Sequence, residues 1–426
     1  MNKKLTVALA GLGARGADSY ATAVLKYPDL MEIVAIADID PEKVADVAGK
    51  YNIPPEACYD SAEAMLEAPQ LADVMFITTQ DKQHVSHAIP AIKKGYHLLL
   101  EKPISPDLEE CRELVRVAKE HERHVIVCHV LRYTPFYTKL KELLDSGIVG
   151  DITTVAGFEY VGYAHQAHSF VRGNWRNSVE TSPMILAKCC HDMDLYLWLT
   201  GKICESVSSF GNTYLFKEEK APAGCTKRCL DGCLVKAECL FDAEKIYMDS
   251  PDGIRNGHTS WPVNVVTLNP TEASVYEALQ TGPYGRCVYH CDNDVVDHQI
   301  VNMNMTDGSL ISFTMTAFTE KTARESKIMG TLGEITAYME ENIIKVRPFG
   351  KEEFVIDVNT LATDFSGHGG GDHQMVKEFL EVVSGASVMK SHMTSIEVSV
   401  ESHYIAMAAE ASRLAGGKVI KVGDMR

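Results

Sequence analysis

Residues 5–16 have the sequence LTVALAGLGARG, in which a short apolar run leads into the pattern G-x-G-x-x-G at Gly11, Gly13 and Gly16. A strand followed by this spacing and then by a helix is typical of a dinucleotide-binding turn. Gly11 would form the tight turn, Gly13 would let the backbone approach a pyrophosphate, and Gly16 would let the helix pack close to the strand. The free N–H groups at the start of the helix would then face the phosphates. A purely structural glycine turn is the alternative.

The chain around this turn alternates short apolar runs with helix-like segments as far as residue 130. Strands rich in Val, Ile and Leu are typical of a parallel sheet that helices cover on both faces. We therefore predict an α/β Rossmann domain over residues 1–131. Its expected strands lie in LTVALAGLG, EIVAIADID, DVMFITT, YHLLLEKP and HVIVCHV.

Asp38 ends the predicted second strand, in the sequence AIADID. A carboxylate at this place accepts hydrogen bonds from the hydroxyl groups of an adenosine ribose and repels a 2′-phosphate. The next residue is Ile39, so no arginine follows that would accommodate the phosphate. Asp38 and the glycine turn together predict that the cofactor is NAD rather than NADP.

The composition limits the classes of partner. The 426 residues carry a formal net charge of -17; 46% of them are hydrophobic and 23% are charged. These values fit a soluble globular protein of two or three domains, and the negative charge disfavours nucleic acid and anionic membranes. The lysines and apolar residues at the start resemble a signal peptide, but the apolar run continues into Arg15 and is better explained as a strand. We therefore expect a cytoplasmic protein whose 12 cysteines are mostly reduced thiols or metal ligands.

Longer strand-like segments follow residue 131. DITTVAGFEYVGY and ITAYMEENIIKVRP have strand-type patterns, and TDGS at residues 306–309 is a hairpin turn between two more strands. We expect residues 132–426 to form an α+β substrate-binding domain with a large, mostly antiparallel open sheet and with helices over residues 375–383 and 396–414. An exposed face of such a sheet favours a homo-oligomer, a dimer or a tetramer.

The strand in YHLLL is followed by Glu101, Lys102 and Pro103, which places Lys102 at the carboxyl end of a parallel strand, where such sheets bind ligands. In this motif the chain resembles the Gfo/Idh/MocA family, the glucose-fructose oxidoreductase and inositol dehydrogenase family, whose members act mostly on sugars and cyclitols. The resemblance implies that Lys102 contacts the nicotinamide ribose and the reacting hydroxyl of the substrate. It also implies cofactor contacts from Arg15, Thr78, His84 and Glu101.

The segment ILAKCCHDMDLYLWL, residues 185–199, places ionisable side chains in an apolar run. It resembles the family's acid-base segment through His191, but Ala187 stands where that segment has an aspartate. We expect His191 to be the catalytic base and Lys188 to take part of the missing acid's role. In one continuous helix, Lys188 and Asp194 would share the face of His191, so that Asp194 orients the ring on the substrate-binding side and a nearby cation lowers its pKa. A packed core histidine is the alternative.

The segment YVGYAHQAHSFVRGNW, residues 160–175, is rich in aromatic and hydrogen-bonding side chains. Aromatic faces with polar tips suit a carbohydrate, which offers apolar C–H faces edged by hydroxyls. A metal site at the two histidines and a merely packed loop are the alternatives. The predicted substrate-binding residues are Tyr160, His165, His168, Arg172 and Trp175.

The segment GCTKRCLDGCLVKAEC, residues 224–239, contains four cysteines amid turn-forming residues. Four thiols in a reducing compartment suit a structural Zn²⁺ ion or an iron-sulfur cluster. The spacing differs from the usual pair of C-x2-C motifs, and free thiols are the alternative. The predicted ligands are Cys225, Cys229, Cys233 and Cys239.

These features together predict an NAD-dependent oxidoreductase that removes hydride from a carbinol carbon of a sugar, a cyclitol or a glycoside. His191 or Lys102 would take the hydroxyl proton. One alternative is a redox-neutral glycosidase or lyase that holds NAD tightly and uses transient oxidation and elimination. Another is a non-catalytic protein that binds NAD or a metal as a sensor.

Overall fold

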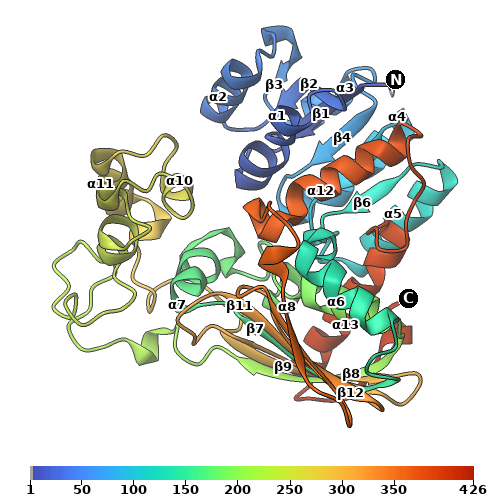
Figure 1. Ribbon diagram of the computed structural model, residues 1–426. Helices are drawn as coiled ribbons and strands as arrows, with labels where there is room; N and C mark the ends of the chain where they lie inside the picture. Colours follow the sequence, from blue (N-terminus) through green and yellow to red (C-terminus); the bar gives the residue numbers. More distant parts are fainter. Residues whose placement is uncertain (1–2) are drawn as a thin grey trace.

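The first of two sheets in the computed structural model, which describes residues 3–426, is parallel and has six strands (Figure 1). Its strand order, β3-β2-β1-β4-β5-β6, reverses between β1 and β4. Ligands of such sheets bind beyond the carboxyl ends of the strands at that reversal. The predicted doubly wound domain is confirmed. Its strands are β1 (Leu5–Ala10), β2 (Met31–Ala37), β3 (Cys58–Tyr59), β4 (Val74–Ile77), β5 (His97–Leu100) and β6 (Val125–Val127).

Alternate residues of these strands face two different cores. Ala8 and Ala10 pack with α3, α4 and α5, whereas Val7 and Leu9 pack with α1, α2 and α12. Since α12 comes from the far end of the chain, the C-terminal part completes one face of the first domain (Figure 1). The boundary at residue 131 therefore stays a prediction. The helices are α1 (Ala23–Lys26), α2 (Pro41–Tyr51), α3 (Ala62–Glu67), α4 (His84–Lys94), α5 (Leu108–Glu120) and α12 (Ser366–Val383).

The second sheet has nine strands in the order β14-β13-β12-β11-β7-β10-β9-β8-β15. Its neighbours pair antiparallel except for β7 and β10, which confirms the mostly antiparallel sheet. Gly308, with a φ of +86°, lies in the predicted hairpin turn between β9 and β10. The strands are β7 (Ile152–Tyr160), β8 (Cys204–Asn212), β9 (His298–Met305), β10 (Leu310–Thr316), β11 (Ala323–Gly330), β12 (Gly333–Tyr338), β13 (Ile343–Pro348), β14 (Phe354–Asp357) and β15 (Ile420–Lys421).

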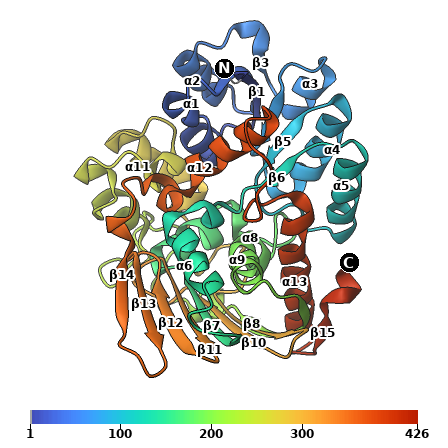
Figure 2. The same ribbon diagram turned by 45° about the vertical axis from the view of Figure 1, so that its right-hand side comes forward.

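Helices cover the face of the second sheet that is turned toward the first domain (Figure 2). Exposed apolar side chains, among them Phe210, Ile300 and Leu310, are 59%, 44% and 53% exposed on strands of this sheet. Assembly of several copies through an open face of the sheet stays a prediction. The covering helices are α6 (Pro135–Asp145), α8 (Met184–Ala187), α9 (Cys190–Thr200) and α13 (Ile396–Leu414).

Residues 213–297, between β8 and β9, form a separate lobe at the side of the molecule (Figure 1). The lobe contains α10 (Val263–Val266) and α11 (Glu272–Thr281) and has its own apolar core around Phe216 and Tyr247. That core also takes in residues of the segment that follows α7 (Tyr163–His165). The lobe therefore lies against a segment that we predicted to bind substrate.

No helix within residues 3–426 has both the length and the apolar character that crossing a bilayer requires. The cytoplasmic location stays a prediction.

Candidate functional site

The glycine turn lies between β1 and a π-helical turn over Ala14–Tyr20. Gly11 has a φ of +91°, and a β-carbon there would lie 2.5 Å from the carbonyl oxygen of Thr78. A β-carbon on Gly16 would lie 2.0 Å from the carbonyl oxygen of Gly11, whereas one on Gly13 would meet nothing within 4 Å. Glycine is therefore required at the first and third positions, and the backbone at Gly13 is open. These residues fit a pyrophosphate.

Thr78, at the end of β4, holds this turn closed. Its hydroxyl lies 2.6 Å from the carbonyl oxygen of Gly11 and 3.0 Å from that of Ala10, and donates to them. The Thr78 side chain therefore stabilises the glycine turn. A direct contact of Thr78 with the cofactor stays a prediction.

Asp38 follows β2 and reaches the same turn. Its Oδ2 accepts a hydrogen bond from the backbone N–H of Leu12 at 2.5 Å, and its Oδ1 accepts one from Asp40 at 2.9 Å. The carboxylate therefore stands beside the glycine turn, where an adenosine ribose would reach it. It also stabilises the turn, a role that the sequence pattern did not predict.

We expect Asp38→Ala to weaken NAD binding and to reduce the discrimination against NADP, because the variant lacks both the ribose acceptor and the charge that repels a 2′-phosphate. Asp38→Asn is the matched control for the turn, since an amide oxygen can still accept from Leu12. Titration of each variant with NAD and NADP measures the effect. An unchanged ratio of the two dissociation constants in both variants would exclude the assignment.

Arg15 and Glu101 join the glycine turn to two other elements. The Arg15 Nε donates to Glu101 Oε1 at 2.8 Å, and its Nη2 donates to Asp372 Oδ1 at 2.8 Å. Glu101 is 5% exposed and also accepts a hydrogen bond from the hydroxyl of Tyr20 at 2.6 Å. These groups link the glycine turn to β5 and α12, and contacts of Arg15 and Glu101 with the cofactor stay a prediction.

His84, the first residue of α4, has both ring nitrogens occupied by backbone carbonyls. Nδ1 lies 2.6 Å from the carbonyl oxygen of Pro103, and Nε2 lies 3.0 Å from that of Thr79. The ring is 1% exposed. The ring therefore fixes the turn that carries Lys102. A contact of His84 with the cofactor stays a prediction.

Lys102 crosses from the first domain to the second. It follows the carboxyl end of β5, and its Nζ donates to the carbonyl oxygen of Ala187 at 2.8 Å. Ala187 is the last residue of α8, directly before Lys188 and four residues before His191. Thus the structure brings the Glu-Lys-Pro turn to the predicted acid-base segment.

That segment is two helices rather than one. α8 ends at Ala187 and α9 begins at Cys190, with Lys188 and Cys189 in a turn between them. His191 therefore lies in the first turn of α9, and Lys188 does not share its helix. The expected continuous helix is wrong.

His191 is an almost fully buried imidazole, 7% exposed. Burial lowers its pKa well below the ordinary value, and the positive charge of Lys102 and the nearby ring of His129 lower it further. The ring of His129 lies edge-on at 5.4 Å. The Nδ1 atom of His191 is buried and has no hydrogen-bond partner among residues 3–426. This arrangement favours the neutral form of the imidazole.

Asp194 does not orient this ring. Its Oδ1 and Oδ2 each accept a hydrogen bond from the guanidinium of Arg132 at 2.6 Å, and the two side chains are 1% and 2% exposed. Such a bidentate pair occupies both oxygens. The predicted role of Asp194 in orienting His191 is therefore wrong, because the residue neutralises a buried arginine, whereas its contact with a substrate stays a prediction.

A series of neighbouring ion pairs begins at Lys188. Lys188 Nζ lies 3.3 Å from Glu159 Oε1, and Glu159 Oε2 lies 2.7 Å from Arg324 Nη2. Arg324 Nε in turn donates to Asp192 Oδ1 at 2.9 Å. Burial raises the pKa of Asp192 to about 6, although the positive charge of Arg324 opposes this shift. The side chain of Lys188 is 16% exposed, so this end of the series of ion pairs reaches the surface.

Glu159 and Arg324 were not predicted from the sequence, although one position of β7 indicates a buried charge. Its buried residues are Val155, Gly157 and Glu159, so a carboxylate takes the third place on an otherwise apolar face. A charge on the buried face of a strand requires a partner. Such a position indicates a buried ion pair near a site.

Tyr160 points away from this region. Because strand residues alternate between faces, Glu159 is buried on the inner face and Tyr160 lies on the outer one. The hydroxyl of Tyr160 donates to Glu325 Oε2 at 3.0 Å. A contact of Tyr160 with a substrate stays a prediction.

His168 and Arg172 are packed inside the lobe. His168 is 2% exposed, and its ring stacks on that of Tyr284 with 4.7 Å between centroids. Arg172 is 1% exposed and donates from Nη2 to the carbonyl oxygen of Phe241 at 2.6 Å. Packing against the lobe encloses both residues, and their contact with a substrate stays a prediction.

His165 and Trp175 lie nearer to the site. Burial and the positive charge of Lys188 both lower the pKa of His165. Trp175 donates from Nε1 to Asp81 Oδ1 at 3.1 Å and so links the second domain to the first. Contact of these two residues with a substrate stays a prediction.

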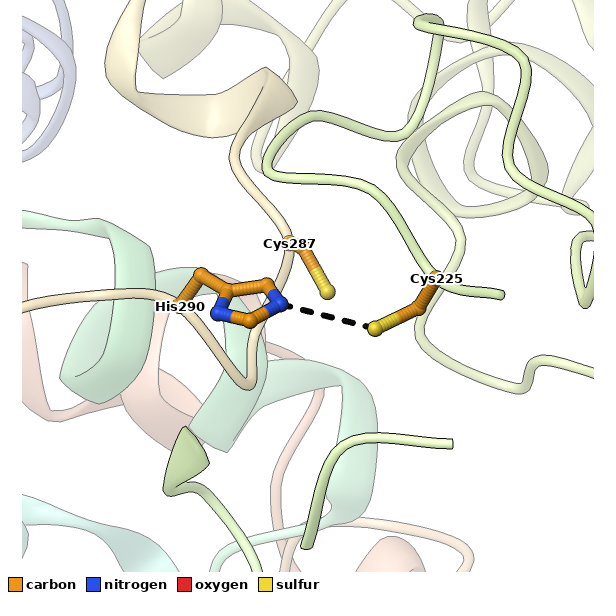
Figure 3. A group of neighbouring side chains, drawn as sticks. All are labelled: Cys225, Cys287 and His290. Carbon is orange, nitrogen blue, oxygen red and sulfur yellow. Dashed lines mark hydrogen bonds between the residues drawn. The ribbon is translucent and has the colours of Figure 1, made fainter. Parts of the chain in front are cut away.

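The four predicted metal ligands do not converge as a set. In the described part of the chain, the metal-ligand grouping includes only Cys225 from that set, together with Cys287 and His290 (Figure 3). Cys229, Cys233 and Cys239 line the adjacent cavity. The predicted ligand set is therefore wrong in composition.

Profiles of one oxidoreductase family match both parts of the chain. Residues 5–129 match its NAD-binding Rossmann fold, and residues 141–402 match its C-terminal alpha/beta domain.

Individual relatives are distant. The oxidoreductase YteT of Bacillus subtilis is 23% identical over 388 residues, which is 87% of each chain. Inositol 2-dehydrogenase of Corynebacterium glutamicum is 28% identical over 208 residues, 49% of this chain and 57% of that one. The solved structure of a levoglucosan dehydrogenase with NADH and levoglucosan is 18% identical and has a TM-score of 0.70 over 99% of this chain and 100% of that one. This structure shares the fold.

Proposed function

The chain belongs to the Gfo/Idh/MocA family of oxidoreductases, and we propose that it oxidises a carbinol carbon of a sugar, a cyclitol or a glycoside with NAD. The observation that carries this proposal is the 2.8 Å hydrogen bond from Lys102 Nζ to Ala187. It joins the end of a parallel strand, where a dinucleotide binds, to the segment that holds His191. Relatives named for inositol and levoglucosan support the substrate class.

The glycine turn and Asp38 are the residues that would hold NAD. Gly11 and Gly16 admit no side chain, Gly13 leaves its backbone open, and Asp38 offers a carboxylate beside the turn. Bound NAD would accept the hydride from the carbinol carbon. The remaining task of the protein is to bind the substrate hydroxyl and to remove its proton.

His191 is suited to take that proton. Burial and the positive charge of Lys102 lower its pKa and so favour the neutral imidazole, whose ring nitrogen can accept a proton from a hydroxyl. Lys102 uses one ammonium N–H for Ala187 and has two left. These can donate to the substrate oxygen and stabilise the negative charge that develops when the proton leaves.

The pKa of His191 predicts the acid limb of the pH profile. A base with a lowered pKa stays unprotonated until the solution becomes more acidic than usual, so activity is lost only below that lowered pKa. We expect kcat to stay nearly constant from about pH 8 down to about pH 6.5, the ordinary pKa of imidazole. Steady-state rates with saturating NAD measure this. A half-maximal kcat at about pH 6.5 or above would contradict the assignment of His191 as the base.

Two assays test the proposed reaction. Incubation of the protein with NAD and a panel that includes myo-inositol, levoglucosan and simple sugars should accumulate NADH, which its absorbance reports. Incubation with aryl glycosides should release no aglycone unless NADH also forms. Aglycone release without net NADH would replace the proposal by redox-neutral cleavage. NAD binding without turnover of any substrate would favour the non-catalytic alternative.

A further inference from the structure

The lobe at residues 213–297 has little regular structure to hold it together. Apart from α10, α11 and short helical turns, it consists of irregular chain around a small apolar core. Irregular segments of this size commonly need disulfides or a metal ion to become ordered. Six of the 12 cysteines lie in the lobe, and none of the cysteines in the described chain forms a disulfide.

Backbone pairing brings two distant parts of the lobe together. The N–H of Cys229 donates to the carbonyl oxygen of Gly285 at 3.0 Å, and the N–H of Cys287 donates to that of Lys227 at 2.9 Å. An isolated antiparallel bridge forms between Arg228 and Arg286 at the same place. Cys225 and Cys287 therefore stand on neighbouring segments although they are far apart in the sequence.

Two thiols and an imidazole lie close together at this junction. Ligand atoms of Cys225, Cys287 and His290 all lie within 4.8 Å of one another, and the side chains point toward a common space (Figure 3). The distance from Cys225 Sγ to His290 Nε2 is 3.5 Å. Zinc bonds of about 2.3 Å to sulfur and about 2.1 Å to nitrogen at a tetrahedral angle separate the two atoms by about 3.6 Å. The observed distance is close to this separation.

A small cavity at the junction offers further ligands. It is lined by Cys225 and Cys287 and also by Cys229, Cys233 and Cys239. We propose that Cys225, Cys287 and His290 bind one structural Zn²⁺ ion and that a thiol from the other three cysteines completes the tetrahedron. The thiols that bind release their protons to solvent. An imidazole among thiolates in a tetrahedral site is typical of zinc.

The zinc ion would also order the part of the lobe that packs against the segment between β7 and α8. Arg172 lines the same cavity, and its Nη2 lies 3.5 Å from Cys229 Sγ and 2.6 Å from the carbonyl oxygen of Phe241. Four residues earlier, His168 stacks on Tyr284 of the lobe. Order in the lobe therefore stabilises the segment that connects β7 to α8.

Elemental analysis of the full chain, purified without chelators, tests this proposal. We expect about one zinc per chain, the occupancy of one closed structural site. Cys287→Ser and His290→Ala should each lose most of the bound zinc. Cys58→Ser is the matched control, because Cys58 is a partly exposed cysteine of the first domain and should leave the zinc content unchanged.

Cobalt replaces zinc in a second measurement that does not depend on the variants folding. Wild-type protein loaded with Co²⁺ should show the visible bands of a tetrahedral ion and a thiolate charge-transfer band. Wild-type protein without metal, or with iron and sulfide in place of zinc, would overturn the proposal. Retention of full zinc content by both Cys287→Ser and His290→Ala would overturn the ligand assignment.

Discussion

Lys102→Ala should lower kcat/KM by about a hundredfold or more, the scale of losing a positioned group in proton transfer. The wild-type ammonium is held between the domains by its hydrogen bond to Ala187, so its position is already fixed before a substrate binds. An alanine has no donor for the substrate oxygen. Initial rates with the best substrate of the panel, at saturating NAD, measure the loss.

Lys82→Ala is the matched control for Lys102→Ala. Lys82 is an exposed lysine of the first domain that also donates to a backbone carbonyl of the second domain, that of Val179. If the loss came from weaker docking of the domains, both variants would lose activity together. We expect only Lys102→Ala to do so, and equal losses in the two variants would contradict a catalytic role.

The parts of this site that follow from local sequence were predictable. Gly16 is required by a steric contact within the glycine turn, Gly11 by its φ of +91° and by the close approach of Thr78 after β4, and Asp38 stands at the end of a strand. Lys102 was predictable for the same reason, since the ends of parallel strands meet at one edge of a sheet. Each of these predictions needs only the alternation of strands and helices and one short motif.

The partners of the charged residues depend on tertiary contacts that a pattern does not contain. Arg15 pairs with Asp372, which lies 357 residues away in the sequence. Asp194 pairs with Arg132, which belongs to a different segment. In both cases a charged residue near a motif pairs with a buried partner that the motif does not specify. No spacing within the motif reveals which partner a charge will meet.

His191→Ala should lower kcat by about a hundredfold or more, because the variant lacks the neutral ring nitrogen that accepts the hydroxyl proton. NAD affinity should be nearly unchanged, since the glycine turn and Asp38 lie in the other domain. Single-turnover rates and NAD titration measure the two quantities separately. His97→Ala is the matched control, because His97 starts β5 at the end of the sheet opposite to Lys102.

Lys188→Ala tests whether His191 acts as the base without Lys188 or shares the proton transfer with it. The Lys188 ammonium is paired with Glu159 at 3.3 Å and stands outside α9, so we expect a smaller loss than for His191→Ala. A loss as large as that of His191→Ala would instead show that the lysine shares the proton transfer, in the place where the family has an aspartate. Near-normal turnover of a folded His191→Ala variant would show that His191 only packs against His129, and that Lys102 alone must handle the proton.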